Sequence, residues 1–138
     1  MTQRLFHTAA VPFEAALRVP VLPAAHRAAR LHGHSYRLRV VCRAPVDERT
    51  GLAIDFGELK RIVHAEVLDH LDHAFLNDRF PVPSAELVSI WIWDRLVAAG
   101  LTLYEIELRE TEACSVIYRG EGLGAGAGRQ APEPDAGS

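Results

Sequence analysis

The motif His32-Gly33-His34 carries the strongest chemical signal in the sequence. Residues i and i+2 of a β-strand point to the same face, so the two imidazoles could converge on one metal ion, and the glycine between them leaves room for a ligand. A catalytic zinc normally takes three protein ligands and keeps one open position. His26 is the candidate for the third ligand if the intervening segment folds back. The alternative is a pair of surface or hydrogen-bonded histidines.

Asp72-His73 is a second pair of residues whose types suit catalysis. A carboxylate beside an imidazole can fix its tautomer and raise its basicity, which serves general acid-base chemistry. Adjacent residues often point apart, so a solvated helix end is the competing interpretation.

Glu110 ends an alternating run and shares the parity of Tyr104, Ile106 and Leu108. A carboxylate at the end of an inward-facing row must find hydrogen-bond donors, because burying an unpaired charge is costly. It could bind two adjacent N–H groups of a guanidinium or an aminopyrimidinone, or it could form an internal salt bridge with an arginine.

The bulk properties fit one globular domain. The chain has 138 residues and a formal net charge of -3, so it offers no basic field that would gather nucleic acid. No apolar run approaches the length of a membrane span, and the N-terminus lacks the apolar region of a secretion signal. Two cysteines are too few for a disulfide framework. We expect a cytoplasmic protein with no nucleic-acid partner and no membrane partner.

Hydrophobic periodicity predicts an α+β fold, with two helices between the second and third strands of a four-stranded antiparallel sheet and packed on its apolar face. The first helix should present one apolar face from Phe56 to Leu71. The exposed edges of so small a sheet are commonly removed by pairing with other subunits. The predicted elements are strands at 13–17 and 34–44, helices that begin at Asp55 and Ser84, and strands at 103–109 and 114–119.

The last part of the chain, residues 120–138, is rich in glycine, alanine and proline and has no apolar periodicity. We therefore expect a folded domain over residues 1–119 followed by a flexible tail.

Several segments, in order over residues 5–121, resemble the family of 6-pyruvoyl-tetrahydropterin synthase and 6-carboxytetrahydropterin synthase. The bacterial 6-carboxy type, on the route to 7-deazaguanine nucleosides such as queuosine, is the closer of the two. The matching segments are Phe13-Glu14-Ala15-Ala16, Arg30-Leu31-His32-Gly33-His34-Ser35-Tyr36, Ile54-Asp55-Phe56-Gly57-Glu58-Leu59-Lys60, Leu71-Asp72-His73 with Leu76-Asn77, Trp91-Ile92-Trp93-Asp94, and Glu110-Thr111 with Ile117-Tyr118-Arg119-Gly120-Glu121.

The resemblance implies the tunnelling fold, in which subunits join their sheets into a barrel, as a trimer or a hexamer of two trimers with active sites at subunit boundaries. It implies a lyase that acts on 7,8-dihydroneopterin triphosphate. In the family, zinc polarises the substrate side chain, a cysteine acts as base, an Asp-His pair moves protons and a glutamate anchors the pterin ring.

Carried over to this chain, the resemblance assigns roles to matching residues only. His32 and His34 match two zinc ligands, and Asp72 and His73 match the proton relay. The substrate-binding candidates are the pterin anchor Glu110 with its neighbour Thr111, and Ser84 and Glu86 of the softened helix-start motif Pro83-Ser84-Ala85-Glu86.

Two positions break the family pattern. Leu17 stands where the first zinc histidine is expected, and Ala28 stands where the catalytic cysteine is expected. Leucine cannot bind a metal and alanine cannot take a proton. Loss of a general base typically lowers a rate by about 10²–10⁴-fold. Loss of a zinc ligand is at least as serious as loss of its supporting residues, which lowers metal affinity roughly 10–100-fold.

Three hypotheses follow from this mixture of retained and lost residues. The favoured one is a repurposed lyase or cyclase that acts on another pterin-like or heterocyclic substrate in a biosynthetic pathway. The second is a genuine synthase in which His26 compensates as metal ligand or as the catalytic base. The third is a non-catalytic module that binds a pterin or a purine.

Overall fold

The structure is a computed structural model that describes residues 3–121. A five-stranded sheet has the order β3-β1-β2-β4-β5. The predicted tail falls outside the described residues from position 122 onward. The strands are β1 (Arg4–Leu17), β2 (His32–Pro45), β3 (Ala74–Phe75), β4 (Leu103–Arg109) and β5 (Ser115–Tyr118). The helices are α1 (Phe56–Val63), α2 (Asp69–Leu71) and α3 (Ala85–Ala98), with a π-helical turn η2 (His64–Leu68) between α1 and α2 and short 3₁₀ turns η1 (Arg27–Ala29) and η3 (Leu76–Asp78).

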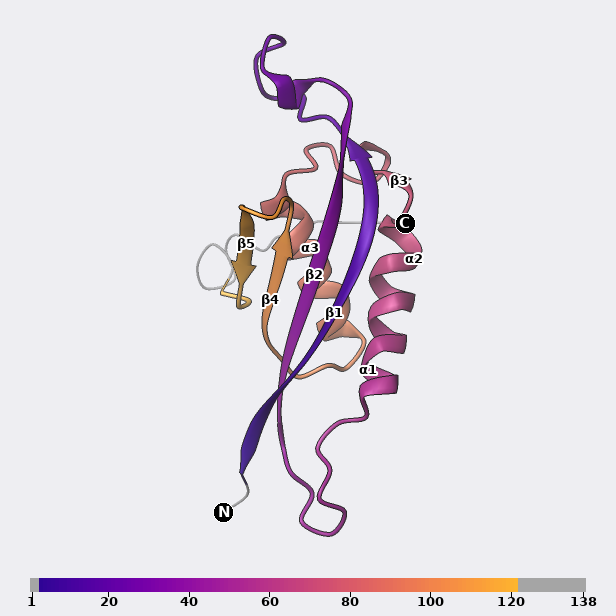
Figure 1. Cartoon of the computed structure of the whole chain (residues 1–138), viewed down its shortest axis with the longest axis vertical. Coiled ribbons are helices and arrows are strands. Elements are labelled where there is room, and N and C mark those ends of the chain that lie inside the picture. The colour runs from indigo at the N-terminus through magenta and orange to yellow at the C-terminus, as the bar shows by residue number, and fades with distance from the viewer. Residues whose placement is uncertain (1–2, 122–138) are drawn as a thin grey trace.

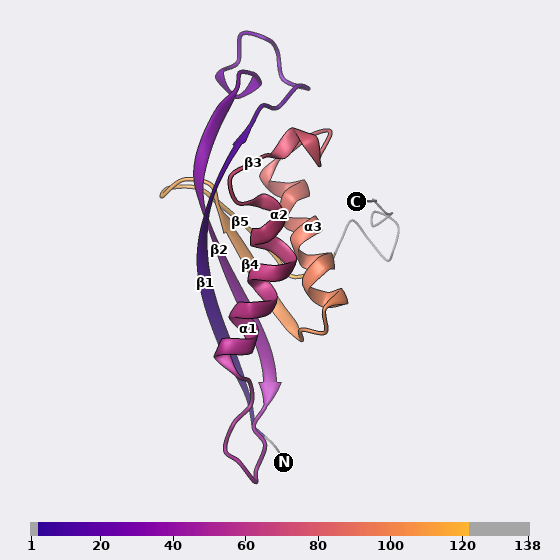
Figure 2. The ribbon, with the colours of Figure 1, turned by 90° about the vertical axis from the view of Figure 1, so that its right-hand side faces the viewer.

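The helices cover one face of the sheet and leave the other face open (Figures 1 and 2). The predicted α+β fold is therefore confirmed, with its antiparallel strands and its helices between β2 and β4. A fifth strand adds to the four predicted, because β3 pairs in parallel with Ala15 and Ala16 of β1. Two residues carry no alternation, so no sequence pattern announces this strand. No helix within residues 3–121 is long and apolar enough to cross a membrane.

Strand β1 is much longer than the predicted strand at 13–17. It pairs with β2 from Arg4 opposite Pro45 to Leu17 opposite His32. Ala9 and Val11 continue the buried face toward the N-terminus, but small side chains alternate too weakly to reveal it. The long ribbon formed by β1 and β2 extends past the body of the molecule (Figure 1). The histidine motif lies at the end of this ladder where Leu17 pairs with His32, so the strand pairing determines its neighbours.

The predicted helix starts are confirmed by their caps. The Asp55 carboxylate accepts hydrogen bonds from the backbone N–H groups of Gly57 and Glu58, at 2.8 and 3.4 Å. The apolar face was predicted to include Phe56, but this side chain is 52% exposed and its ring lies beside His7. Because Phe56 is the first residue of α1, it lies at the end of the helix rather than over the core.

Tyr104 does not share a face with Ile106 and Leu108, contrary to the sequence pattern. The pairing of β2 with β4 shifts between Val41 and Cys42, so that an irregularity interrupts the alternation at this point. The Tyr104 ring packs on Phe6 at 4.7 Å, while Ile106 and Leu108 are fully buried.

The main chain at Gly120 packs directly on Trp93. A Cβ at this position would lie 2.4 Å from a Trp93 ring carbon, and the backbone φ is +82°. We expect Gly120→Ala to lower the free energy of unfolding by about 1–3 kcal/mol, through both overpacking and left-handed strain. Gly51→Ala is the matched control, because Gly51 has a φ of +75° but no atom near its Cβ position. Urea unfolding of both variants measures the difference, and equal losses would contradict the packing argument.

Candidate functional site

Strand pairing places Leu17, His32 and His34 together at one end of the sheet. Leu17 is the direct partner of His32, and Ala15 is the partner of His34. The two imidazole rings lie 5.0 Å apart, in an edge-to-face arrangement, and both side chains are half-buried. Leu17 is 1% exposed and joins the hydrophobic core. The structure therefore brings the predicted histidine pair together with a leucine that has no donor atom.

Glu110 reaches this end of the sheet from the turn between β4 and β5. Its carboxylate oxygen Oε2 lies 3.6 Å from His34 Nε2, within ion-pair distance when the imidazole is protonated. The Glu110 N–H donates to the Cys114 carbonyl at 3.0 Å, which fixes the turn. The sequence left open whether Glu110 binds a ligand or forms a salt bridge with an arginine. Its carboxylate faces His34 of the candidate site, and the neighbouring Arg109 pairs with Glu107 instead.

Tyr36 is a site residue that the sequence analysis missed. Its hydroxyl is buried and finds no hydrogen-bond partner among residues 3–121, and its ring stacks on Phe13 and touches His34 edge-on. Burial and then the Glu110 carboxylate raise the pKa of the Tyr36 phenol, so it stays a neutral donor. The only signal in the sequence is its place two residues after His34 on the same strand face.

The Asp72-His73 pair is tied to β1 through the Asp72 carboxylate and the His73 main chain. Asp72 Oδ1 accepts the Glu14 N–H at 2.9 Å, and Oδ2 lies 3.6 Å from His73 Nε2. The His73 N–H donates to the Glu14 carbonyl at 2.6 Å. His73 has a φ of +60°, a conformation that costs energy for a residue with a Cβ and concentrates at functional sites. Its side chain is 79% exposed, so solvent reaches the imidazole although Nε2 faces Asp72.

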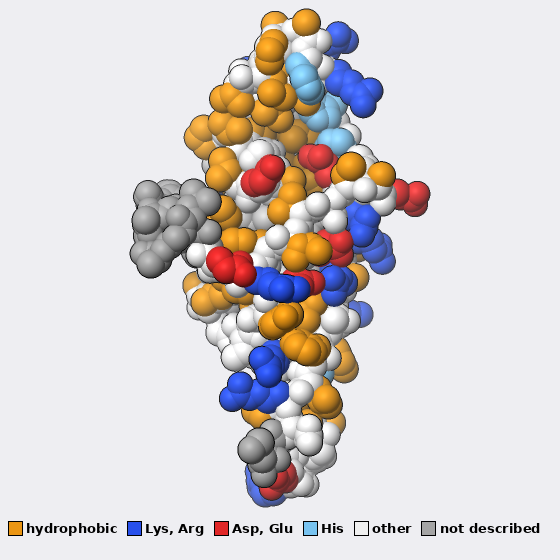
Figure 3. Space-filling model, turned by 90° about the vertical axis from the view of Figure 1, so that its left-hand side faces the viewer, with side chains coloured by type: hydrophobic (Ala, Val, Ile, Leu, Met, Phe, Trp, Pro, Cys, Tyr) orange, Lys and Arg blue, Asp and Glu red, His pale blue; other side chains and the backbone are white. Residues whose placement is uncertain are grey.

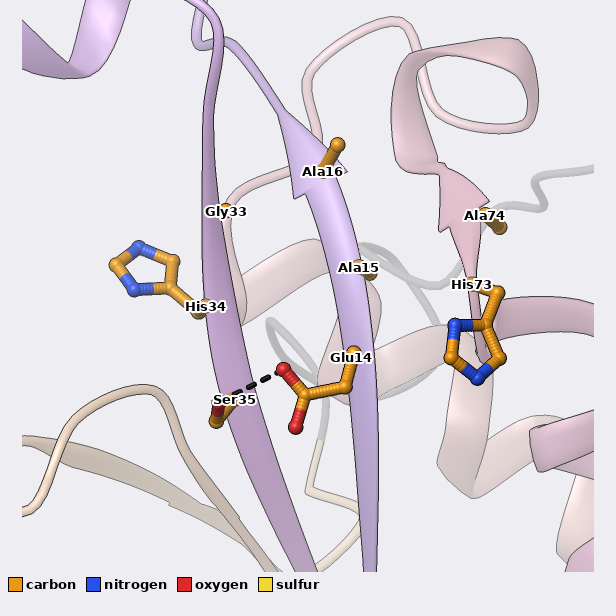
Figure 4. Close-up of a pocket in the computed structure, with 8 residues that line it drawn as sticks. All are labelled: Glu14, Ala15, Ala16, Gly33, His34, Ser35, His73 and Ala74. Atoms are coloured by element: carbon orange, nitrogen blue, oxygen red, sulfur yellow. Dashed lines mark hydrogen bonds between the residues drawn. The ribbon is translucent and has the colours of Figure 1, made fainter.

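An open depression of about 410 Å³ runs across β1 and β2 and meets β3. Glu14 lies in it and accepts a hydrogen bond from the Ser35 hydroxyl at 2.7 Å. Figure 4 shows Glu14 between His34 and His73, with the two imidazoles on either side of the β1–β2 ribbon. Within one chain, the histidine pair and the proton relay are thus not brought into contact.

His26 lies beside the position where the catalytic cysteine was expected. Its Nδ1 accepts the Ala28 N–H at 3.0 Å and caps the turn η1 (Arg27–Ala29). Since Nδ1 is the acceptor, a neutral His26 carries its proton on Nε2 and has no free lone pair there. Among residues 3–121, no three histidine, cysteine, aspartate or glutamate side chains are grouped closely enough to hold a metal ion. The structure thus does not assemble the metal trio expected of His26, His32 and His34.

The remaining substrate-binding candidates lie on turns and helix starts. Thr111 is exposed, and its carbonyl accepts the Cys114 N–H at 3.3 Å. The Ser84 hydroxyl caps α3 by accepting the Leu87 N–H at 3.1 Å, so its oxygen already serves the helix. Glu86 is exposed in the first turn of α3. On the side of the molecule in Figure 3, histidine side chains gather above acidic ones and beside a broad hydrophobic area.

A second titratable cluster lies on the helices, where His70 is held between two arginines. Arg95 Nη2 lies 3.1 Å from His70 Nε2, and Arg79 Nη2 lies 3.3 Å from His70 Nδ1. Burial, followed by the charges of Arg95 and Arg79, lowers the pKa of His70, against the smaller opposing effects of Glu66 and Asp69.

This lowered pKa predicts an acid-sensitive fold. The unfolded chain holds its His70 proton up to a pH of about 6.5, whereas the folded chain binds that proton only at lower pH. Stability should therefore be complete above pH 6.5 and fall as the pH drops from there toward the folded pKa. Urea unfolding between pH 7.5 and pH 5 should show a smaller decline for His70→Gln than for the native chain. An identical decline in both would refute the assignment, and His64→Gln, at an exposed helix position, is the control.

Comparisons with known proteins agree with this fold. Residues 8–121 match the family model described as 6-pyruvoyl tetrahydropterin synthase. The chain is 41% identical over 96 residues to a 6-pyruvoyl tetrahydrobiopterin synthase of Dictyostelium discoideum, covering 65% of this chain and 71% of that protein. It is 38% identical over 113 residues to a 6-carboxy-5,6,7,8-tetrahydropterin synthase of Synechocystis, covering 77% and 86%. The Caenorhabditis elegans 6-pyruvoyl tetrahydropterin synthase structure superposes with a TM-score of 0.76 at 25% identity, covering 86% and 97%.

Proposed function

Because the chain belongs to the 6-pyruvoyl tetrahydropterin synthase family, we propose that it is a divergent lyase or cyclase of that type. Its substrate is a pterin-like or related heterocycle other than 7,8-dihydroneopterin triphosphate, and it serves a biosynthetic pathway. The relatives named above are tetrahydropterin synthases, and their names support the reaction class rather than the substrate.

One observation carries the proposal: the polar groups of the pocket are kept while two reactive positions are not. Glu110 stays within ion-pair distance of His34, and Asp72 stays beside His73 on a strained backbone. The buried Leu17 offers no ligand atom. A site that had simply decayed would have no reason to keep a partly buried carboxylate within ion-pair distance of an imidazole at both places, Glu110 with His34 and Asp72 with His73.

The retained groups suit recognition and proton transfer. The Glu110 carboxylate can accept two parallel N–H groups from the edge of an aminopyrimidinone ring, which gives both orientation and charge assistance. His73, oriented by Asp72, is suited to donate or accept a proton at an exposed ring nitrogen. Since His34 and His73 lie on opposite sides of the β1–β2 ribbon in one chain, we propose that a second copy supplies His73 to complete each site. A trimer or a hexamer built through the sheet edges would bring them together.

A second candidate is a genuine synthase in which His26 replaces the cysteine. The hydrogen bond from the Ala28 N–H to His26 favours it, because it holds the imidazole beside the altered position. In this arrangement the Nδ1 lone pair accepts the Ala28 N–H, so His26 would serve as the base only when that hydrogen bond opens.

Incubation of the native protein with 7,8-dihydroneopterin triphosphate separates these functions. The proposal predicts that 7,8-dihydroneopterin triphosphate binds but is turned over about 10²–10⁴-fold more slowly than by a complete synthase, as expected for a site without its base. Conversion at the full rate would overturn the proposal, and loss of that conversion in His26→Ala would establish the second candidate. A screen of related heterocycles would support the repurposed enzyme if one compound is turned over by the native protein and not by His73→Ala. Binding of these compounds without turnover of any of them would indicate a binding module.

A further inference from the structure

His32 is already arranged as a metal ligand. Its Nδ1 lies 2.8 Å from the Arg30 carbonyl oxygen, and because a carbonyl only accepts, Nδ1 carries the proton and donates it. The lone pair is then on Nε2. Metal-binding histidines are commonly oriented in this way, by donation of the other ring N–H to a backbone carbonyl.

The third position on this face is Leu17, which has no metal-binding atom. Leu17 pairs directly with His32 across the two strands, and both side chains lie on the side that His34 also faces. Side chains of directly paired antiparallel residues have Cβ atoms roughly 4.5–5.5 Å apart, close enough for two imidazoles to share one zinc ion. The Leu17 side chain occupies this place with carbon alone and is 1% exposed.

The other candidate ligands, His26 and Glu110, already have partners. Binding zinc through His26 Nε2 would move the proton to Nδ1, where it would face the Ala28 N–H that Nδ1 now accepts. Glu110 lies against His34, at 3.6 Å from Nε2, so that this imidazole has a carboxylate partner of its own.

We propose that the native pocket works without zinc, with Glu110 as the partner of His34, and that Leu17 is the residue that keeps a three-imidazole zinc site from forming. A catalytic zinc needs three protein ligands, and this face offers two. The inference rests on the proposed function in one respect, namely that the pocket binds a substrate. The test measures only zinc content, so the zinc-free pocket and the proposed function can fail separately.

The experiment compares the native protein with Leu17→His and Leu17→Phe after dialysis against one equivalent of zinc. Leu17→Phe is the matched control, since it places a ring without nitrogen at the same buried position. Metal analysis should find far less than one zinc per chain in the native protein and in Leu17→Phe, and one zinc per chain in Leu17→His. Competition with a chromophoric chelator should give Leu17→His an affinity at least about 100-fold above the native value.

Two results would overturn the proposal. One is a full equivalent of zinc in the native protein that is lost in Glu110→Gln, which would identify a site of two imidazoles and one carboxylate. The other is a full equivalent lost in His26→Ala. If Leu17→His does not fold, the native protein still decides, because the proposal expects its zinc content to be unchanged in His32→Ala.

Discussion

Replacing Leu17 by histidine and Ala28 by cysteine together should raise the turnover of 7,8-dihydroneopterin triphosphate by about 10²–10⁴-fold over the native protein. The thiol would lie on the arm that follows β1, where the Ala28 carbonyl accepts the Val19 N–H at 2.9 Å. This hydrogen bond ties position 28 to the segment just beyond Leu17, so that both changes fall at the same end of the β1–β2 ladder. The strand pairing that places Leu17 opposite His32 would place the new imidazole next to the histidine pair.

The two single variants make the double variant informative. Residues that act as a unit are strongly non-additive, so Leu17→His alone and Ala28→Cys alone should each recover little of the rate. A thiol placed at Ala29 instead of Ala28, in the presence of Leu17→His, controls for general effects of a cysteine on the arm. If the double variant folds, holds one zinc per chain and still fails to gain turnover, the pocket differs from a synthase in more than these two residues.

Glu110→Gln should weaken the binding of neopterin, a pterin probe, by about 10–100-fold. Hydrogen bonds to an ionised group contribute about 1.5–3 kcal/mol each, and an amide offers one acceptor oxygen where the carboxylate offers two. The same change removes the charge that faces His34 at 3.6 Å. Isothermal titration with neopterin measures the loss directly.

The matched control for this change lies in the same turn. Glu112 is exposed and follows Glu110 by two residues, so Glu112→Gln removes the same charge without altering the pocket. Neopterin affinity should be unchanged in Glu112→Gln. Equal affinities of the native protein and Glu110→Gln would show that the carboxylate serves the fold rather than the ligand, and a matching fall in the free energy of unfolding would confirm that role.

Elements with strong periodicity could be predicted from the sequence. The alternation from Tyr36 to Cys42 gave the face of β2 correctly, since these side chains lie in the core. The caps at Asp55 and Ser84 located the helix starts, because a side chain that accepts the first N–H groups is a local signal. The first half of β1 lacked such a signal because several of its residues are small. The π-helical turn η2 (His64–Leu68) lacked one because its residues continue the helical pattern of α1.

The site was predictable in its residue types but not in its contacts. Spacing along the chain does not reveal that Glu110 meets His34, since that contact depends on how β4 pairs with β2. The hydrogen bond of His26 was equally hidden, because it depends on a turn of three residues in an arm rich in alanine. The Leu17 substitution could be recognised from the resemblance, whereas its burial opposite His32 required the structure.

Whether the native pocket holds zinc is tested most directly by an anomalous difference map at the zinc absorption edge, from crystals of native protein prepared with one equivalent of zinc. A pocket that works without zinc gives no peak between the Nε2 atoms of His32 and His34, and its Glu110 carboxylate remains against His34. A fully occupied peak bound by both imidazoles would contradict it, and the third ligand in that map would identify the residue that replaces the histidine missing at Leu17.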